Sequence, residues 1–172
     1  MTLAERFPVP SRLGLLAALG SGALLGGAYY FQYVVGLSPC EMCLWQRYPH
    51  MVAIAVGLLA LASFTWPRLA LVFMLTAITA LLVTSAIGVF HVGVEYHWWP
   101  GPQACTGNVP KGLSPDQLKK YLFGAKMVRC DETAWSMWGI SMAGWNAILS
   151  GGLAIVLSLS VLRHIKPGHE YR

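Results

Sequence analysis

Charged side chains are scarce in this sequence. Asp, Glu, Lys and Arg make up 11% of its 172 residues, whereas an ordinary soluble domain carries about 25%. With 56% of the residues hydrophobic, this deficit indicates an integral membrane protein. The length is that of one compact unit, so we expect a single integral-membrane domain over residues 1–172.

Long basic runs are absent as well. The formal net charge is +5, but the basic residues are scattered, and their longest run is Lys119-Lys120. The sequence therefore shows no basic cluster of the kind that binds nucleic acid. We expect the basic residues to face lipid headgroups, helix ends or the oxygen of a quinone-like molecule.

A second C-x-x-C motif is also missing. Cys40 and Cys43 form the only one, and 24 residues separate the other two cysteines, Cys105 and Cys130. Zinc sites built from cysteines need a second closely spaced pair, so this spacing argues against a metal site. It favours a thiol–disulfide couple.

Four apolar segments predict an all-α, four-helix transmembrane bundle. Each has close to the ~20 residues that cross the hydrocarbon core, and they cover residues 13–37, 45–66, 69–90 and 140–162. The first apolar stretch is longer than that of a signal peptide, so we expect it to be retained. The apolar run of the second segment, residues 51–64, is too short to cross. Its helix must begin earlier, which places Arg47 at the membrane edge.

The two loops that carry the cysteines, residues 38–44 and 92–139, then lie on one side of the membrane. Lys and Arg are equally numerous on both sides, but the positive-inside rule gives more weight to short flanks than to long loops. We therefore expect cytoplasmic N- and C-termini in a bacterial inner membrane. The cysteines would face the periplasm, where disulfides persist.

The long second loop shows its own organisation. Trp98 and Trp99 suit the headgroup level. The stretch Ser114-Pro115-Asp116-Gln117 has the N-cap and first-turn residues of a helix start. A short amphipathic helix is expected to follow and to lie on the membrane surface; a solvated loop helix is the alternative.

Both cysteine pairs are candidates for redox chemistry. A disulfide between Cys105 and Cys130 would stabilise the loop by roughly 3 kcal/mol, and taken alone it would be a structural bond. A second pair on the same membrane face favours an electron relay. Cys40 and Cys43 lie at the N-terminal end of the second helix, where the helix dipole lowers thiol pKa values.

Arg47 follows Cys43 by four residues, so the two share a face of a continuous helix. Its guanidinium would favour the Cys43 thiolate or bind a quinone oxygen. Alternatively, Arg47 anchors the helix to lipid phosphates. Pro49 leaves open whether the helix is continuous here.

Other polar residues near the segments carry weaker signals. His91 is either a hydrogen-bond donor to a cofactor or an interfacial residue at the end of the third segment. Asn146 is expected to form an interhelical hydrogen bond. Six glycines are expected at close helix contacts: Gly22, Gly26, Gly27, Gly144, Gly151 and Gly152.

Taken together, these features resemble the bacterial disulfide bond formation protein B (DsbB) family, quinone-linked thiol oxidases of the inner membrane. The resemblance covers nearly the whole chain. It rests on the order of the cysteines across four segments and on three stretches: residues 40–47 (CEMCLWQR), 98–102 (WWPGP) and 139–146 (GISMAGWN).

The resemblance implies a route for electrons. A soluble thioredoxin-fold oxidase similar to DsbA would attack the Cys105–Cys130 disulfide at Cys105, and Cys130 would then engage Cys40. Cys43 would be left as a thiolate against ubiquinone, or menaquinone, near Arg47, with His91 close to the quinone. The four cysteines are thus the expected catalytic residues, and Arg47 and His91 the expected cofactor contacts.

The sequence admits three other interpretations. A vitamin K epoxide reductase-like enzyme would have its C-x-x-C late in the chain, and here the order is reversed. A haem-binding electron carrier would use His50 and His91 as axial ligands. A non-enzymatic protein with four spans and structural disulfides would keep all its cysteines oxidised.

Overall fold

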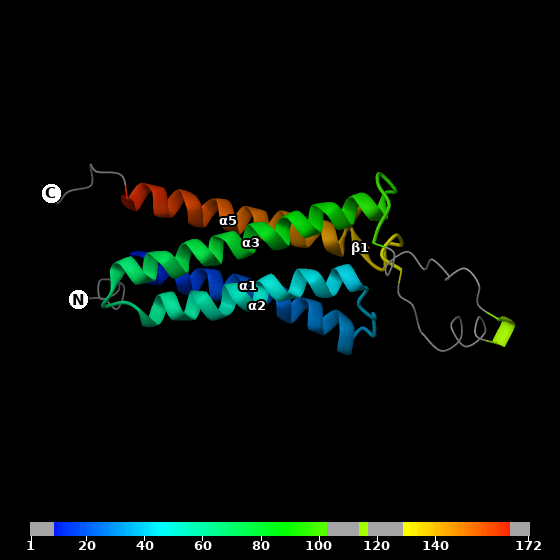
Figure 1. The fold of residues 1–172 in the computed structure, drawn as a ribbon, viewed down its shortest axis with the longest axis horizontal. Helices are drawn as coiled ribbons and strands as arrows, with labels where there is room; N and C mark the ends of the chain where they lie inside the picture. Colours follow the sequence, from blue (N-terminus) through cyan, green and yellow to red (C-terminus); the bar gives the residue numbers. More distant parts are fainter. Residues whose placement is uncertain (1–8, 103–113, 117–128, 166–172) are drawn as a thin grey trace.

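The computed structural model describes residues 9–102, 114–116 and 129–165. Within them, four long helices pack along a common axis (Figure 1): α1 (Val9–Tyr33), α2 (Glu41–Ala62), α3 (Pro67–Glu95) and α5 (Met142–Ile165). The predicted all-α bundle is therefore confirmed. Of the predicted amphipathic helix, only Pro115 and Asp116 are described, and both are helical; the rest lies outside the described residues.

Three of these helices, α1, α3 and α5, are long and apolar enough to cross a membrane. Large apolar side chains such as Leu19, Val72 and Ile155 point outward from them and are more than half exposed, as lipid-facing residues are. Helix α2 is of similar length but carries Gln46, Arg47 and His50 in its N-terminal half. These polar residues lower its hydropathy, and all three are buried against the other helices.

Local sequence explains where the helices begin and end. Pro67 occupies the first turn of α3, where its missing N–H is not needed. Helix α1 stops at Tyr33, ahead of the predicted residue 37, and Gly36 adopts a φ of 84° in the turn that follows. Helix α3 continues to Glu95, five residues beyond the predicted end. Helix α2 runs through Pro49 without interruption, so Cys43 and Arg47 do lie on one continuous helix.

A small hairpin leads into α5 and was not foreseen from the sequence. Strands β1 (Ser136–Met137) and β2 (Ile140–Ser141) pair antiparallel. Trp138 and Gly139 connect them with φ values of 54° and 77°, as in a type I′ turn. The hairpin sits at the cysteine end of the bundle (Figure 1).

The prediction for the glycines was correct in part. A Cβ on Gly151 would meet the Ser85 hydroxyl at 2.9 Å, and one on Gly144 would meet Ile140, so these two positions are tight. The prediction was wrong for Gly22, Gly26, Gly27 and Gly152, where a Cβ would meet nothing within 4 Å. Among the described residues, the closest backbone contact between helices instead joins two glycines that were not singled out, Gly14 of α1 and Gly57 of α2, where a Cβ on either would lie 2.6 Å from the other's carbonyl oxygen.

Candidate active site

The C-x-x-C motif forms the first turn of α2. Cys40 is the N-cap residue, and its sulfur accepts a hydrogen bond from the Cys43 backbone N–H at 3.2 Å. A sulfur atom thus takes the place of the usual Ser, Thr or Asp oxygen. The C-x-x-C spacing equals the distance from the cap to the third helical residue, so the helix start itself brings the two cysteines together.

The two thiols are free and adjacent. The Cys40 thiol donates to the Cys43 sulfur, with the sulfur atoms 2.8 Å apart. This hydrogen bond, together with burial, raises the pKa of Cys40 well above its usual range. Cys40 therefore keeps its proton, and the negative charge of the pair belongs on Cys43.

Cys130 lies beside this pair. Its side chain is fully buried and disulfide-bonded, and its sulfur is within 4.8 Å of the Cys40 sulfur. Cys105 lies outside the described residues. The structure thus places one cysteine of the long loop next to the C-x-x-C.

Arg47 points into the protein. Its side chain is 8% exposed, its Nη1 donates to the Gln32 side-chain oxygen, and its guanidinium lies 4.9 Å from the centre of the Tyr29 ring. Its Nε–H is buried and has no hydrogen-bond partner. This placement does not fit the alternative in which Arg47 reaches out to lipid phosphates.

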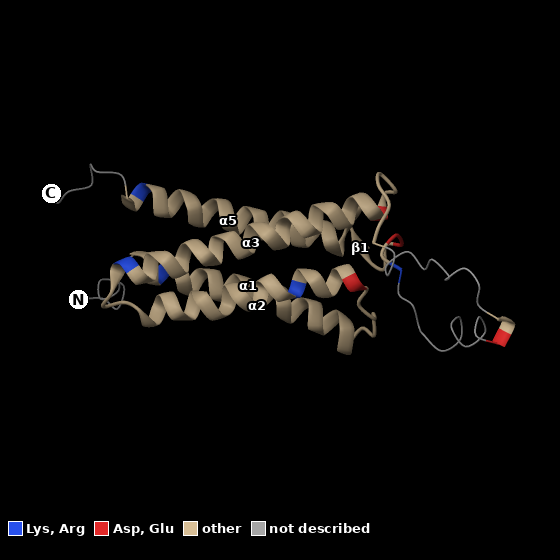
Figure 2. Ribbon diagram, in the orientation of Figure 1, with Lys and Arg blue, Asp and Glu red and all other residues tan. Residues whose placement is uncertain are grey.

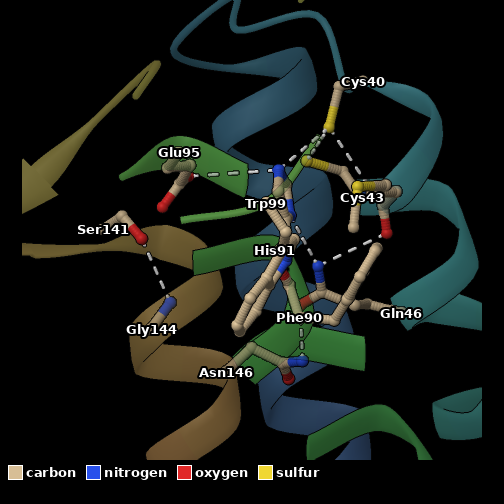
Figure 3. A network of polar contacts seen from close by, with 11 residues as sticks. Cys40, Cys43, Gln46, Phe90, His91, Glu95, Trp99, Ser141, Gly144 and Asn146 are labelled. Atoms are coloured by element: carbon tan, nitrogen blue, oxygen red, sulfur yellow. Dashed lines mark hydrogen bonds and ion pairs between the residues drawn. The ribbon is translucent and has the colours of Figure 1, made fainter. Parts of the chain in front are cut away.

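His91 is also buried, at 3% exposure, and lies one turn inside α3. The interpretation of this residue as an interfacial helix-end histidine is therefore wrong, because α3 continues past the predicted boundary. Its Nδ1 lies 2.9 Å from the Gln46 amide nitrogen, and its Nε2 lies 3.6 Å from the Cys40 sulfur (Figure 3). Glu95, one turn later, approaches the same Nε2 at 4.0 Å.

Asn146 of α5 connects the helices below the cysteines. Its amide nitrogen donates to the Gln46 side-chain oxygen at 2.7 Å and to the Thr84 hydroxyl at 3.0 Å. Its oxygen accepts from His50 at 2.8 Å and from Ser150 at 3.0 Å. The predicted interhelical hydrogen bond of Asn146 is confirmed.

A cavity of about 460 Å³ adjoins these residues. Small side chains of α1, including Ala23, Gly27 and Ala28, form one wall, and α5 contributes to the wall that faces them. The polar residues of the lining are Ser38, Cys40, Cys43, Gln46, Arg47, His50, His91, Glu95, Arg129, Glu132 and Asn146. The C-x-x-C, Arg47 and His91 thus share one largely apolar chamber.

Comparison with known proteins identifies the family. Residues 10–160 match the family described as "Disulfide bond formation protein DsbB". The chain belongs to the DsbB family.

Among its relatives, the disulfide bond formation protein B of Polaromonas naphthalenivorans is 33% identical over 145 residues, covering 81% of this chain and 83% of that protein. The protein of the same name from Actinobacillus pleuropneumoniae is 31% identical and covers 92% and 89%. The one from Haemophilus influenzae strain 86-028NP is 26% identical and covers 96% and 93%. Membership in the DsbB family makes the chain a multi-pass membrane oxidoreductase of disulfide bond formation.

Two features of the DsbB-family site were missed from the sequence. Gln46 precedes Arg47 and was not singled out, and Glu95 was placed in the loop. Gln46 lies three residues from Cys43 and four from His50, so helical spacing alone would have put it near both.

Proposed function

We propose that the chain is a quinone-dependent thiol oxidase that reoxidises a periplasmic, DsbA-like disulfide oxidase. One observation carries this proposal: Cys43 and Arg47 line the same cavity, one helical turn apart, while the sulfur of Cys130 lies within 4.8 Å of Cys40. Electrons from a dithiol donor would therefore pass through the loop cysteines to the C-x-x-C and then to a molecule held in the cavity.

The residues of the cavity suit a quinone. Its volume falls within the ~300–1,000 Å³ of small-molecule sites, and apolar walls with a few polar groups are typical of such sites. The unpartnered Nε–H of Arg47 is a buried donor for a ligand oxygen. A bound quinone supplies a two-electron, two-proton acceptor, and ubiquinone or menaquinone would both serve. We propose Arg47 as its donor, and the contact predicted for His91 remains a prediction.

The proposed order of electron transfer is the one that the resemblance to the family implies. A dithiol donor attacks the Cys105–Cys130 disulfide at Cys105 and releases Cys130 as a thiolate. That thiolate attacks Cys40 in the Cys40–Cys43 disulfide: the Cys130–Cys40 bond forms, and Cys43 leaves with the electron pair. A DsbA-type oxidase has a reduction potential of about −120 mV, so other thiols can hardly reoxidise it. A quinone is therefore needed as the final electron acceptor.

Orientation in the membrane is part of the proposal. Among the described residues, Arg12, Arg68 and Arg163 lie at the end of the bundle away from the cysteines, while Arg47 and Arg129 lie toward the cysteine end (Figure 2). The positive-inside rule gives most weight to basic residues on short flanks, so this distribution supports cytoplasmic termini and periplasmic cysteines in a bacterial inner membrane.

Filling the cavity tests the proposal. Gly27 lines the cavity and a Cβ there meets nothing within 4 Å, so Gly27→Leu should place its side chain in the quinone site. We expect the KM for ubiquinone to rise about tenfold while the fold is kept. Gly152→Leu is the matched control, because Gly152 is equally open but lies outside the cavity. Equal KM values in both variants would argue against a quinone in this cavity.

A further inference from the structure

A chain of two side-chain amides runs beneath the C-x-x-C motif. It passes from Asn146 of α5 to Gln46 of α2 and on to His91 of α3, which contacts Cys40 (Figure 3). All of these groups are buried or partly buried. The direction of each hydrogen bond in such a chain decides which nitrogen of the histidine carries the proton.

Two backbone carbonyls fix the direction of the chain. The amide nitrogen of Asn146 faces the carbonyl oxygen of Thr84 at 3.4 Å, and that of Gln46 faces the carbonyl oxygen of Met42 at 3.3 Å. A carbonyl oxygen only accepts, so each amide must turn its NH2 group toward it. Asn146 therefore donates to the Gln46 oxygen, and Gln46 donates to its remaining neighbour.

That neighbour is Nδ1 of His91, at 2.9 Å from the Gln46 nitrogen. Because Nδ1 accepts, the neutral ring carries its proton on Nε2. Nε2 lies 3.6 Å from the Cys40 sulfur and 4.0 Å from a Glu95 carboxylate oxygen, and the ring also contacts the Cys130 backbone. The N–H is thus directed into a group of acceptors that includes the Cys40 sulfur.

We propose that Gln46 and Asn146 are positioning residues that hold His91 as an Nε2–H donor to the sulfur of Cys40. The donor stabilises negative charge on that sulfur. This role rests on the proposed function, and it distinguishes Cys40 from Cys43, whose charge lies beside Arg47.

Cys40 carries that charge in one half of the exchange. When the Cys105 thiolate attacks Cys130 of a Cys130–Cys40 disulfide, the Cys105–Cys130 bond forms. The Cys130–Cys40 bond breaks, and its electron pair stays on Cys40 as a thiolate. The Nε2–H of His91 and the backbone N–H of Cys43 are the two donors placed to stabilise this leaving group. Closing the bond from this thiolate to Cys43 releases two electrons, which the quinone of the proposed function would accept.

The arrangement also decides against a metal at this place. Cys40, His91 and Cys130 bring their ligand atoms within 4.8 Å of one another, as in a possible ion site. A metal on Nε2 would need that nitrogen free of its proton and Nδ1 protonated. Gln46 presents a donor to Nδ1, so the network favours hydrogen-bond donation over metal ligation.

Two measurements on the full-length protein in detergent test the proposal. The first is the 15N spectrum of protein labelled in its histidines, with His91 assigned by loss of its signals in His91→Phe. At neutral pH we expect Nε2 protonated and Nδ1 bare. In Gln46→Glu the carboxylate accepts from Nδ1, so Nδ1 should become protonated.

The second measurement is the pH dependence of Cys40 alkylation by iodoacetamide, with Cys43→Ala, Cys105→Ser and Cys130→Ser leaving Cys40 as the single thiol. Loss of one hydrogen bond to a charged group should lower the rate at neutral pH by about tenfold in Gln46→Met and in His91→Phe. Ser158→Ala, which removes a hydrogen bond to Ala154 within α5, should leave the rate unchanged.

A protonated Nδ1 in the wild-type protein would overturn the proposal, even where a variant fails to fold. Alkylation rates within twofold of the parent in both variants would overturn it as well. Neither measurement uses quinone or a partner protein, so failure of the proposed function would appear in quinone turnover and leave both readouts in place.

Discussion

Cys40 and Cys43 have the same chemistry but different environments. Cys40 is buried at the helix cap, donates a hydrogen bond to the Cys43 sulfur, and has a raised pKa. Cys43 is partly exposed to the cavity and lies one turn before Arg47. Under the proposed function this asymmetry assigns separate tasks: Cys43 would face the electron acceptor, and Cys40 would face the loop cysteine.

Arg47 offers the sharpest test at the residue scale. Arg47→Ala removes a buried donor to the cavity, and we expect slower quinone reduction with a KM for quinone raised about tenfold, while the Cys105–Cys130 disulfide stays intact. Arg163→Ala, a change of the same charge at the far end of α5, is the control. An unchanged apparent affinity for quinone would contradict this role for Arg47.

Single residues could be predicted from the sequence only where a local rule applied. The spacing of Cys43 and Arg47 along a helix and the polar side chain of Asn146 in an apolar segment both gave correct expectations. The contact of His91 with Cys40 and Gln46 joins residues 51 and 45 positions apart. Such contacts depend on how α2 and α3 pack, which no local pattern contains.

At the scale of helices, the bundle depends on close contact between α1 and α2. Gly57→Ala would place a methyl group 2.6 Å from the Gly14 carbonyl oxygen and 3.2 Å from the Ala18 side chain. The helices must separate, and we expect a loss of about 1–3 kcal/mol in the free energy of unfolding. Unfolding in mixed detergent micelles with increasing SDS measures it.

Gly22→Ala is the matched control, since a Cβ there meets nothing within 4 Å. It should be neutral or slightly stabilising, because alanine favours a helix more than glycine does. Similar losses in both variants would show that the Gly14–Gly57 contact has no special role.

Helix positions followed from the hydropathy pattern to within a few residues, because apolar length determines where a chain crosses a membrane. The glycine contacts did not follow in the same way. Gly22, Gly26 and Gly27 look like a packing face in the sequence, but a Cβ on any of them meets open space, and Gly27 borders the cavity. The hairpin before α5 was also missed, because a strand of two residues is too short to show the alternation of polar and apolar residues that predicts a strand.

On the scale of the whole molecule, successive helices run in opposite directions, which brings distant parts of the chain to one end of the bundle (Figure 1). The start of α2, the end of α3 and the hairpin before α5 meet there (Figure 1), with Cys40, His91 and Cys130 among them. The opposite end carries the first turn of α1 and the last turn of α5. The proposed redox chemistry is thereby confined to one side of the bundle, beside a cavity formed mainly by α1, α2, α5 and residues 129–138.

Quinone reduction by the purified protein, with a reduced DsbA-like dithiol as electron donor, tests the central claim most directly. Wild type and Cys43→Ser are compared with ubiquinone and with menaquinone. The account predicts that the wild type consumes quinone and that Cys43→Ser does not, because the sulfur facing the cavity is gone. Failure of the wild type with both quinones, or equal turnover by the variant, would contradict it.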